Sequence, residues 1–211
     1  VFSFEPEKDN FKFLKKNIKL NKLKNVYSFN CAVLDKEGYK KLFITPDKSY
    51  LHSFYRTDSN KSKIVKTISL KKIFDDNNIS FCHFLKIDAE GSEYEILKNL
   101  PLDYFKKIGI IALEFHDCIK ENDSKNIIRL LTKNGFRINY LFKYFDDFRL
   151  GIVIAKASEM NKLFLILVNY DKCFGISEDL TKLKEKIPRI LGFFGIFIKK
   201  RDMKMYYFLK N

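Results

Sequence analysis

The sequence predicts an α/β fold with a mostly parallel sheet and an antiparallel last strand. Short apolar segments alternate with amphipathic helical segments from residue 1 to residue 157, an alternation typical of parallel α/β sheets. The last two apolar segments, 136–142 and 150–155, are joined by a polar stretch that is too short for a crossover helix. These two strands should therefore be antiparallel.

The N-terminal part of the chain predicts a strand, a helix and two further strands. Val1–Phe4 alternates apolar residues around a serine and stops at Glu5, which begins a turn. Asp9 can cap a helix that runs to about Leu20, because apolar residues recur there at helical spacing. Two more strands are expected at 26–33 and 40–44. The polar stretch 45–63 that follows them is the candidate for a mobile loop.

The central part of the chain predicts two buried strands that end in polar residues. Phe81–Ile87 is a nearly continuous apolar run before Asp88, as expected for a central strand covered on both faces. Ile108–Phe115 is a second buried strand, and polar residues cluster at its end. The other predicted elements are a strand at 64–68, a helix from its cap Ser69 to Asp75, a helix at Gly91–Asn99 and a helix at Asn126–Asn134 that Gly135 ends.

Residues 158–211 depart from this pattern and are expected to form an extension of the preceding domain. Ser177 can cap a short helix that Pro188 interrupts, and the apolar run Ile190–Ile198 precedes three basic residues. Three roles stay open for this part: an edge that covers the sheet, a partner interface, or a segment at a membrane surface. A peripheral membrane contact would involve residues 187–201.

Charge and cysteine usage exclude several classes of protein. The formal net charge is +14, but lysine is spread over nearly every segment, so we do not expect nucleic-acid binding, which needs a clustered basic face. The four cysteines have neither CxxC spacing nor a histidine partner at zinc-ligand spacing. We therefore expect a reduced, cytoplasmic protein. No apolar run reaches the roughly 18 residues that a transmembrane helix needs.

Acidic residues gather where the predicted strands end. Ligands of open parallel sheets bind at the carboxyl ends of the strands, and here these ends carry Glu5, Ala32, Asp88 and the group Glu114–Asp117. A carboxylate in the position of Glu5 can accept hydrogen bonds from both hydroxyls of a ribose. Its alternative role is only to begin the next helix, where the helix dipole favours an acidic residue.

The sequence resembles the FkbM family of methyltransferases. The most specific match is the run Leu85–Leu97, which reads LKIDAEGSEYEIL, and the FEP triplet at 4–6 accompanies it. The segment ALEFH at 112–116 resembles the fifth-strand motif of that family, and 130–136 resembles its helix that ends in Gly-Phe. The resemblance covers roughly residues 1–156.

This resemblance implies a Rossmann-like class I methyltransferase fold whose last strand is antiparallel. It also implies that S-adenosylmethionine is used to methylate a hydroxyl group of a small molecule or glycan. Glu5 would hold the cofactor ribose, and Asp88 would lie near the sulfonium and the acceptor. The residues implied for the cofactor are Glu5, Pro6, Asn30, Cys31, Ala32 and Asp88. Those implied for the acceptor and catalysis are Asp88, Glu90, Glu114 and His116.

One part of the family pattern is absent from this sequence. The first strand and its Gly-rich turn would lie before Val1, and the eight glycines form no GxGxxG-like cluster. Without that strand, Val1–Phe4 would lack a central neighbour in the sheet. The alternative functions are therefore a truncated, non-catalytic remnant and, because of the extension, an accessory of membrane or glycan assembly.

Methyl transfer to oxygen needs the two reacting atoms in line and a base that accepts the hydroxyl proton. Asp88 and His116 are the candidate bases, although a lone histidine after a strand is equally compatible with a structural role. Asp88, Glu90 and Glu93 resemble the carboxylate clusters of metal-assisted methyltransferases. Acidic residues at a helix start are favoured by the dipole without any ion, so we predict no metal.

Overall fold

The computed structural model describes residues 1–45, 52–55, 61–116, 124–144, 150–158, 196–199 and 202–207. The chain divides into two compact units, Val1–Met160 and Asn161–Asn211. The first unit is a mixed α/β fold and contains every residue named above for cofactor or acceptor. The predicted functional division at residues 157 and 158 stays a prediction.

Strands and helices alternate in parts of the first unit, and the short helix at 102–105 and the strands at 196–199 and 202–207 were not predicted. In chain order the elements are β1 (Phe2–Phe4), α1 (Lys8–Leu20), β2 (Tyr27–Phe29), β3 (Ala32–Leu34), β4 (Gly38–Phe43), β5 (Ser62–Ser69), α2 (Leu70–Asp76), β6 (Cys82–Asp88), α3 (Glu93–Lys98), α4 (Leu102–Phe105), β7 (Ile108–His116), α5 (Ser124–Lys133), β8 (Phe136–Tyr144), β9 (Leu150–Ala157), β10 (Ile196–Lys199) and β11 (Asp202–Tyr207).

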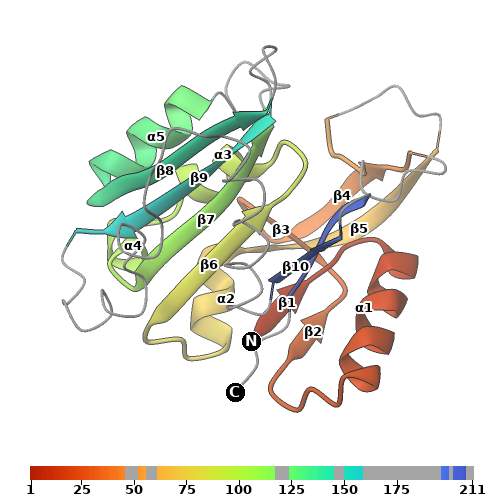
Figure 1. The fold of residues 1–211 in the computed structure, drawn as a ribbon. Helices are drawn as coiled ribbons and strands as arrows, with labels where there is room; N and C mark the ends of the chain where they lie inside the picture. Colours follow the sequence, from red (N-terminus) through yellow and green to blue (C-terminus); the bar gives the residue numbers. More distant parts are fainter. Residues whose placement is uncertain are drawn as a thin grey trace. The chain divides into compact units, whose positions relative to one another are not determined.

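The described strands of the first unit form separate small sheets (Figure 1). β1 pairs with β2 in parallel. β5 lies between β3 and β4, parallel to β3 and antiparallel to β4. The largest sheet has the order β6-β7-β9-β8, and β6 and β7 are parallel.

The closing strand pair is antiparallel, as predicted, because β9 runs antiparallel to both β8 and β7. The sheets are nevertheless only partly parallel, which differs from the mostly parallel sheet expected. The turn at 35–37 reverses the chain between β3 and β4. β4 therefore runs opposite to β3 and pairs antiparallel with β5.

The segment 26–33, predicted as one strand, forms two strands in two different sheets. Tyr27–Phe29 pairs with β1, and Ala32–Leu34 pairs with β5. The break falls at Asn30, whose side chain donates hydrogen bonds to the carbonyl oxygens of Glu5 and Pro6. These bonds hold Asn30 against the end of β1, so the chain leaves one sheet there and enters the next.

Of the predicted helix starts, that of α2 agrees with the sequence, whereas α3 begins two residues later and α5 two residues earlier than predicted, and α1 has a different cap. Glu7, not Asp9, caps this helix: the Glu7 carboxylate accepts hydrogen bonds from the N–H groups of Asp9 (2.7 Å) and Asn10 (2.9 Å). The backbone of Glu7 is extended, as a capping residue requires, whereas Asp9 already lies in the first turn. Ser69 caps α2, as predicted, because its Oγ accepts from the N–H of Lys72 (3.1 Å).

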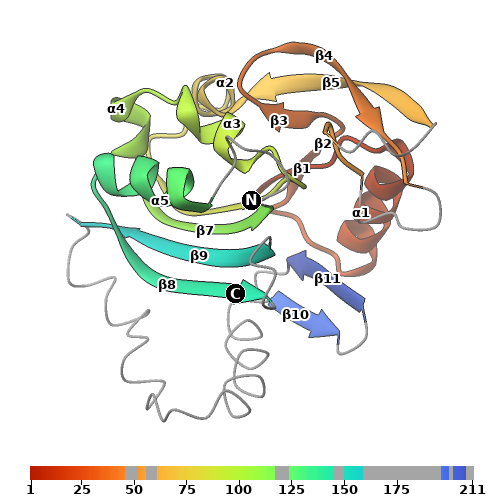
Figure 2. The same ribbon diagram turned by 90° about the horizontal axis from the view of Figure 1, so that it is seen from above.

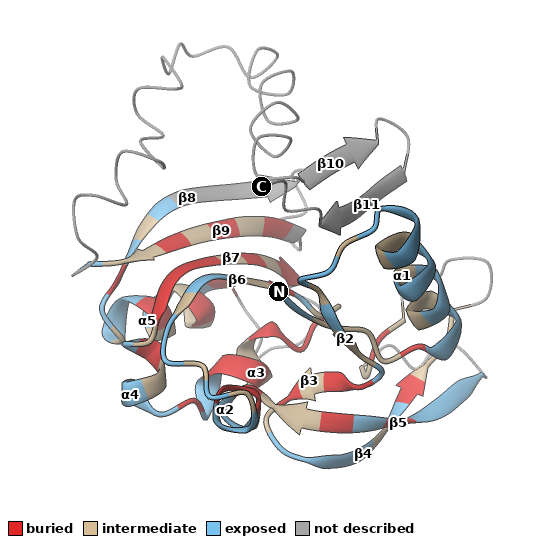
Figure 3. Ribbon diagram, turned by 90° about the horizontal axis from the view of Figure 1, so that it is seen from below, coloured by how far each residue is buried: buried red, intermediate tan, exposed pale blue. Residues whose placement is uncertain are grey.

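The hydrophobic core lies between the β6-β7-β9-β8 sheet and the helices α2, α3 and α5, which cover one face of the sheet (Figure 2). β7 is buried almost along its whole length (Figure 3). β6 is not the fully covered central strand that its apolar sequence predicts, since Phe84 is 47% exposed. Among the described residues β6 pairs with a strand on one side only, β7.

Some predicted segments lie partly or wholly outside the described residues. Within the predicted loop 45–63, Ser53 forms an antiparallel bridge with Phe43, and β5 already begins at Ser62. The described part of the extension is the antiparallel pair of β10 and β11. The helix predicted from Ser177 is not among the described residues. No helix in the described part of the chain is long and apolar enough to cross a membrane.

Candidate active site

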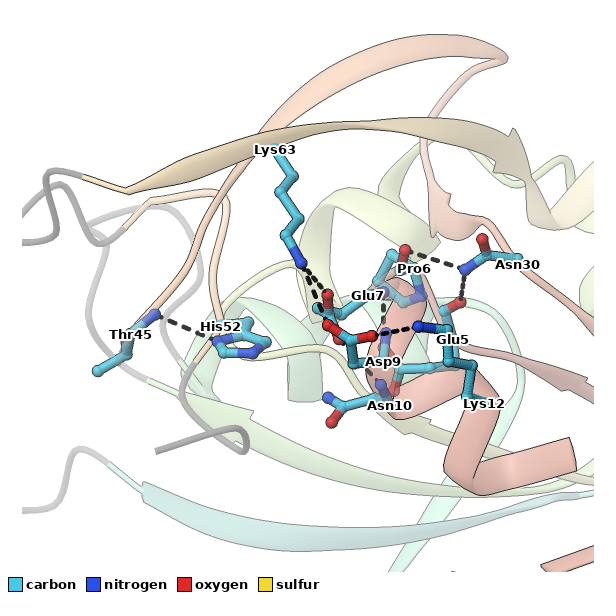
Figure 4. A network of polar contacts seen from close by, with 10 residues as sticks. All are labelled: Glu5, Pro6, Glu7, Asp9, Asn10, Lys12, Asn30, Thr45, His52 and Lys63. Carbon is cyan, nitrogen blue, oxygen red and sulfur yellow. Dashed lines mark hydrogen bonds and ion pairs between the residues drawn. The ribbon is translucent and has the colours of Figure 1, made fainter. Parts of the chain in front are cut away.

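The first group of predicted site residues lies at the carboxyl end of β1 (Figure 4). The Glu5 N–H donates to the carbonyl oxygen of Phe29 (3.1 Å) and so continues the pairing of β1 with β2. Asn30 Nδ2 donates to the carbonyl oxygens of Glu5 (2.9 Å) and Pro6 (3.1 Å). Glu5, Pro6 and Asn30, which the resemblance implies for a cofactor site, therefore lie together.

The Glu5 carboxylate is half-buried and can change its charge near neutral pH. Burial raises the pKa of Glu5 to about 7, and the hydrogen bond from the Glu7 N–H opposes that rise. Glu5 Oε1 accepts this bond at 2.8 Å. Each carboxylate oxygen can accept two hydrogen bonds, so Glu5 keeps acceptor capacity for the hydroxyl groups of a ligand.

Cys31 and Ala32 differ from the other residues of this group because both are buried. Burial also raises the pKa of the Cys31 thiol. Within the predicted segment, only Asn30 presents an exposed side chain. Cys31 and Ala32 therefore shape the site through their backbone and by packing.

An ion pair between the buried Glu7 and the half-exposed Lys63 supports the end of β1, and the sequence did not predict it. The Glu7 side chain is buried and forms an ion pair with Lys63 from β5. Burial alone would raise the pKa of Glu7, but the hydrogen bonds from Lys63 and from two peptide N–H groups lower it below its usual value. Lys63 thus fixes the turn that carries Glu5 and Glu7 (Figure 4).

The second group lies at the carboxyl ends of β6 and β7. Asp88 and Glu114 are register partners in this parallel pair. Burial, followed by the charge of Asp88, raises the pKa of Glu114 to about 7. Lys86 Nζ donates to Asp88 Oδ2 at 2.8 Å, so a cation balances one of the two carboxylates.

His116 lies between two further carboxylates. Its Nδ1 is 3.0 Å from Glu93 Oε1, and its Nε2 is 3.5 Å from Glu90 Oε2. Burial alone would lower the pKa of His116, but the hydrogen bond with Glu93 and the nearby carboxylates raise it to about 9. The imidazole is therefore mainly protonated at neutral pH and forms ion pairs with both carboxylates.

The turn between β6 and α3 has an unusual backbone. Glu90 has a φ of +47° and Gly91 a φ of +101°, and a left-handed conformation at a residue other than glycine is often found at functional sites. Ser53, which is buried, donates from Oγ to the carbonyl oxygen of Glu90 (2.7 Å). This contact holds the turn from a distant part of the chain.

The segment 52–55 connects the two groups. His52 lies beside Glu7 and Lys63 in the first group, and its Nδ1 accepts from the N–H of Thr45 at 3.2 Å (Figure 4). The next residue, Ser53, contacts Glu90 in the second group. Burial lowers the pKa of His52, which favours its neutral form and its role as an acceptor.

The second group also contains potential metal ligands. Asp88, Glu114 and His116 each offer one donor atom, and these atoms lie within 4.8 Å of one another. Carboxylate and imidazole ligands suit several divalent ions. Lys86 pairs with Asp88, and the charges of Lys86 and protonated His116 act on Glu114, while methyl transfer needs no ion. We therefore keep the prediction of no metal.

The sequence did not predict several residues that hold the site together. They are Ser53, Lys63 and Lys86, while Glu93 was named only as a member of a carboxylate cluster and not as a partner of His116. Only Glu93 carries a local signal: it begins a helix directly after a glycine turn, where a carboxylate can bond back to the N–H groups of the turn. The partners of Ser53 and Lys63 lie 37 and 56 residues away, and no pattern in the sequence marks them. Asp117, named with the second group, lies outside the described residues.

A comparison with protein-family models agrees with the motifs. The model of the methyltransferase FkbM domain matches residues 1–138. A search of curated proteins found no match. Among solved structures, the chain is similar to the crystal structure of the methyltransferase FkbM from Methylobacillus flagellatus, with 17% identity and a TM-score of 0.48. That similarity covers 73% of this chain and 36% of the other, so this chain spans little more than a third of that protein's length.

Proposed function

Because this chain belongs to the FkbM methyltransferase family, we propose that it transfers the methyl group of S-adenosylmethionine to a hydroxyl oxygen of a small molecule or glycan. The observation that carries this proposal is that both groups of site residues place carboxylates at or near strand ends. Glu5 directly follows β1, Asp88 ends β6, and Glu114 lies two residues before the end of β7. Strand ends of this kind are where α/β sheets bind ligands.

The residues at the end of β1 fit the nucleoside part of the cofactor. Glu5 retains acceptor capacity for two ribose hydroxyls, and its carbonyl is anchored by Asn30. Pro6 and the Asn30-Cys31-Ala32 segment lie beside it and would border the adenine. When bound, S-adenosylmethionine supplies a methyl group on a positively charged sulfur, and the carboxylate of Asp88 would favour that charge.

The carboxylates of β6 and β7 would handle the acceptor hydroxyl. As the bond between oxygen and methyl carbon forms and the carbon–sulfur bond breaks, the hydroxyl proton must pass to a base. Glu114 suits this step because its pKa is raised to about 7 by burial and by Asp88. His116 suits it less well, since a protonated imidazole cannot accept a proton. We assign His116 and Glu90 to binding and orienting the acceptor.

A second candidate function is that of a non-catalytic member of the family. A chain of this kind would keep the acidic strand ends but would bind S-adenosylmethionine weakly or not at all.

Calorimetric titration of S-adenosylhomocysteine into the chain distinguishes the two. We expect binding in the wild type and a loss of about tenfold or more in Glu5→Gln, because a carboxylate that bonds two hydroxyls contributes roughly 1.5–3 kcal/mol. Glu37→Gln is the matched control, since Glu37 is exposed and bonds Ser69 away from the site. An absence of binding to the wild type would favour the non-catalytic function, and equal binding by both variants would remove Glu5 from the cofactor site.

A further inference from the structure

Glu93 is a carboxylate that solvent does not reach. Its side chain is fully buried at the start of α3. One oxygen, Oε1, accepts hydrogen bonds from the N–H groups of Ala89 and Gly91, each at 3.1 Å, and lies 3.0 Å from His116 Nδ1. The other oxygen, Oε2, has no hydrogen-bond partner among the described residues. A buried carboxylate that is only partly satisfied destabilises a fold, so stability alone does not explain it.

We propose that Glu93 is a positioning residue for the acceptor side of the site. Through Nδ1 it fixes the ring of His116, and through the N–H groups of Ala89 and Gly91 it fixes the turn that carries Glu90. One buried carboxylate therefore holds both the ring of His116 and the turn that carries Glu90. In this arrangement His116 Nε2 lies 3.5 Å from Glu90 Oε2. The inference rests on the proposed function in one respect, the assignment of His116 and Glu90 to the acceptor.

The charged groups named around His116 come from several elements. Glu93 belongs to α3, Glu90 to the preceding turn and Glu114 to β7 itself, while β6 contributes the ion pair of Lys86 and Asp88. Of the two carboxylates that form ion pairs with the ring, Glu93 is the nearer, at 3.0 Å against 3.5 Å for Glu90. It also meets Nδ1, so Nε2 is left to face Glu90. A carboxylate on one ring nitrogen fixes the protonation and direction of the other.

The test is a titration of the histidine rings by nuclear magnetic resonance in the complete 15N-labelled chain. We expect Glu93→Gln to lower the pKa of His116 by about one to three pH units, the usual effect of removing an adjacent charge. His52 and His83 serve as internal references. Glu95→Gln is the matched control, because Glu95 lies on the same helix but bonds Lys40. An unchanged His116 titration in Glu93→Gln would overturn the proposal.

A second measurement needs no variant and covers the case in which Glu93→Gln does not fold. In the wild type at neutral pH, the proton on His116 Nδ1 should be visible and should exchange slowly with water, because it is buried against Glu93. A ring without a proton on Nδ1 would contradict the proposal. Titration of S-adenosylhomocysteine into the same sample keeps the two hypotheses apart: its failure would affect the proposed function and leave the His116 result intact.

Discussion

At the scale of single residues, burial and neighbouring charge decide which groups of the site carry a proton. Glu114 and His116 lie near the end of the same strand, yet their pKa values are raised for different reasons. Burial and Asp88 raise the pKa of Glu114 to about 7. Carboxylates on both sides of its ring raise the pKa of His116 to about 9. The histidine is therefore a fixed cation at neutral pH, and the carboxylate is the group that can exchange a proton.

His116 should stabilise the folded chain at low pH and lose this effect as the pH rises. Its pKa is raised from 6.5 to about 9, so the stabilisation is complete below the unfolded-state pKa and disappears as the pH passes the folded-state value. A shift of this size corresponds to roughly 3 kcal/mol. Urea unfolding of the wild type and His116→Gln at about pH 6 and about pH 9.5 measures it. A difference in unfolding free energy that does not shrink with pH would contradict this prediction.

At the scale of elements, α1 depends on its first residues more than on its apolar face. None of its residues is buried, and its apolar side chains Phe11, Leu14 and Ile18 are only half-buried. Short helices gain little from propensity alone. The cap and ion pair of Glu7 should therefore decide where α1 begins and how firmly its start is held beside Glu5.

Glu7→Ala should destabilise the chain by about 1–2 kcal/mol, because it removes two capping bonds and leaves Lys63 without its buried partner. Asp9→Ala is the matched control and should destabilise the chain much less, since Asp9 is exposed and caps no helix N–H. Chemical unfolding followed by circular dichroism measures both. Equal costs for the two variants would mean that the cap of Glu7 contributes nothing.

At the scale of the whole molecule, the compartment, partners and methyl acceptor stay predictions. The net charge of +14 is spread over the chain, and the extension ends its apolar run with Lys199, Lys200 and Arg201. A cytoplasmic protein with a peripheral membrane contact through residues 187–201 is compatible with this distribution. Each basic residue near an anionic surface contributes about 1 kcal/mol of attraction.

Co-sedimentation with vesicles of anionic lipid tests the membrane contact. If the extension binds the vesicles, changing Lys199, Lys200 and Arg201 together to Gln should lower the affinity about fivefold for each charge removed. The bound fraction should fall accordingly. Changing Lys15, Lys16 and Lys19 of α1 to Gln removes the same charge elsewhere and is the control. A similar loss in both triple variants would show a general charge effect and exclude a specific contact of the extension.

The sequence by itself determined the family, the α/β alternation, the antiparallel closing pair and the residues Glu5, Asp88, Glu90, Glu114 and His116 at strand ends or turns. These features depend on local periodicity, motif identity and connection length. Only the tertiary structure decided that 26–33 splits between two sheets, that β6 is partly exposed and that Glu93 meets His116. These features depend on strand register and on contacts such as the 23-residue separation of Glu93 and His116. Strand register brings distant side chains together, and the packing around them excludes water. Neither effect is visible in the local sequence.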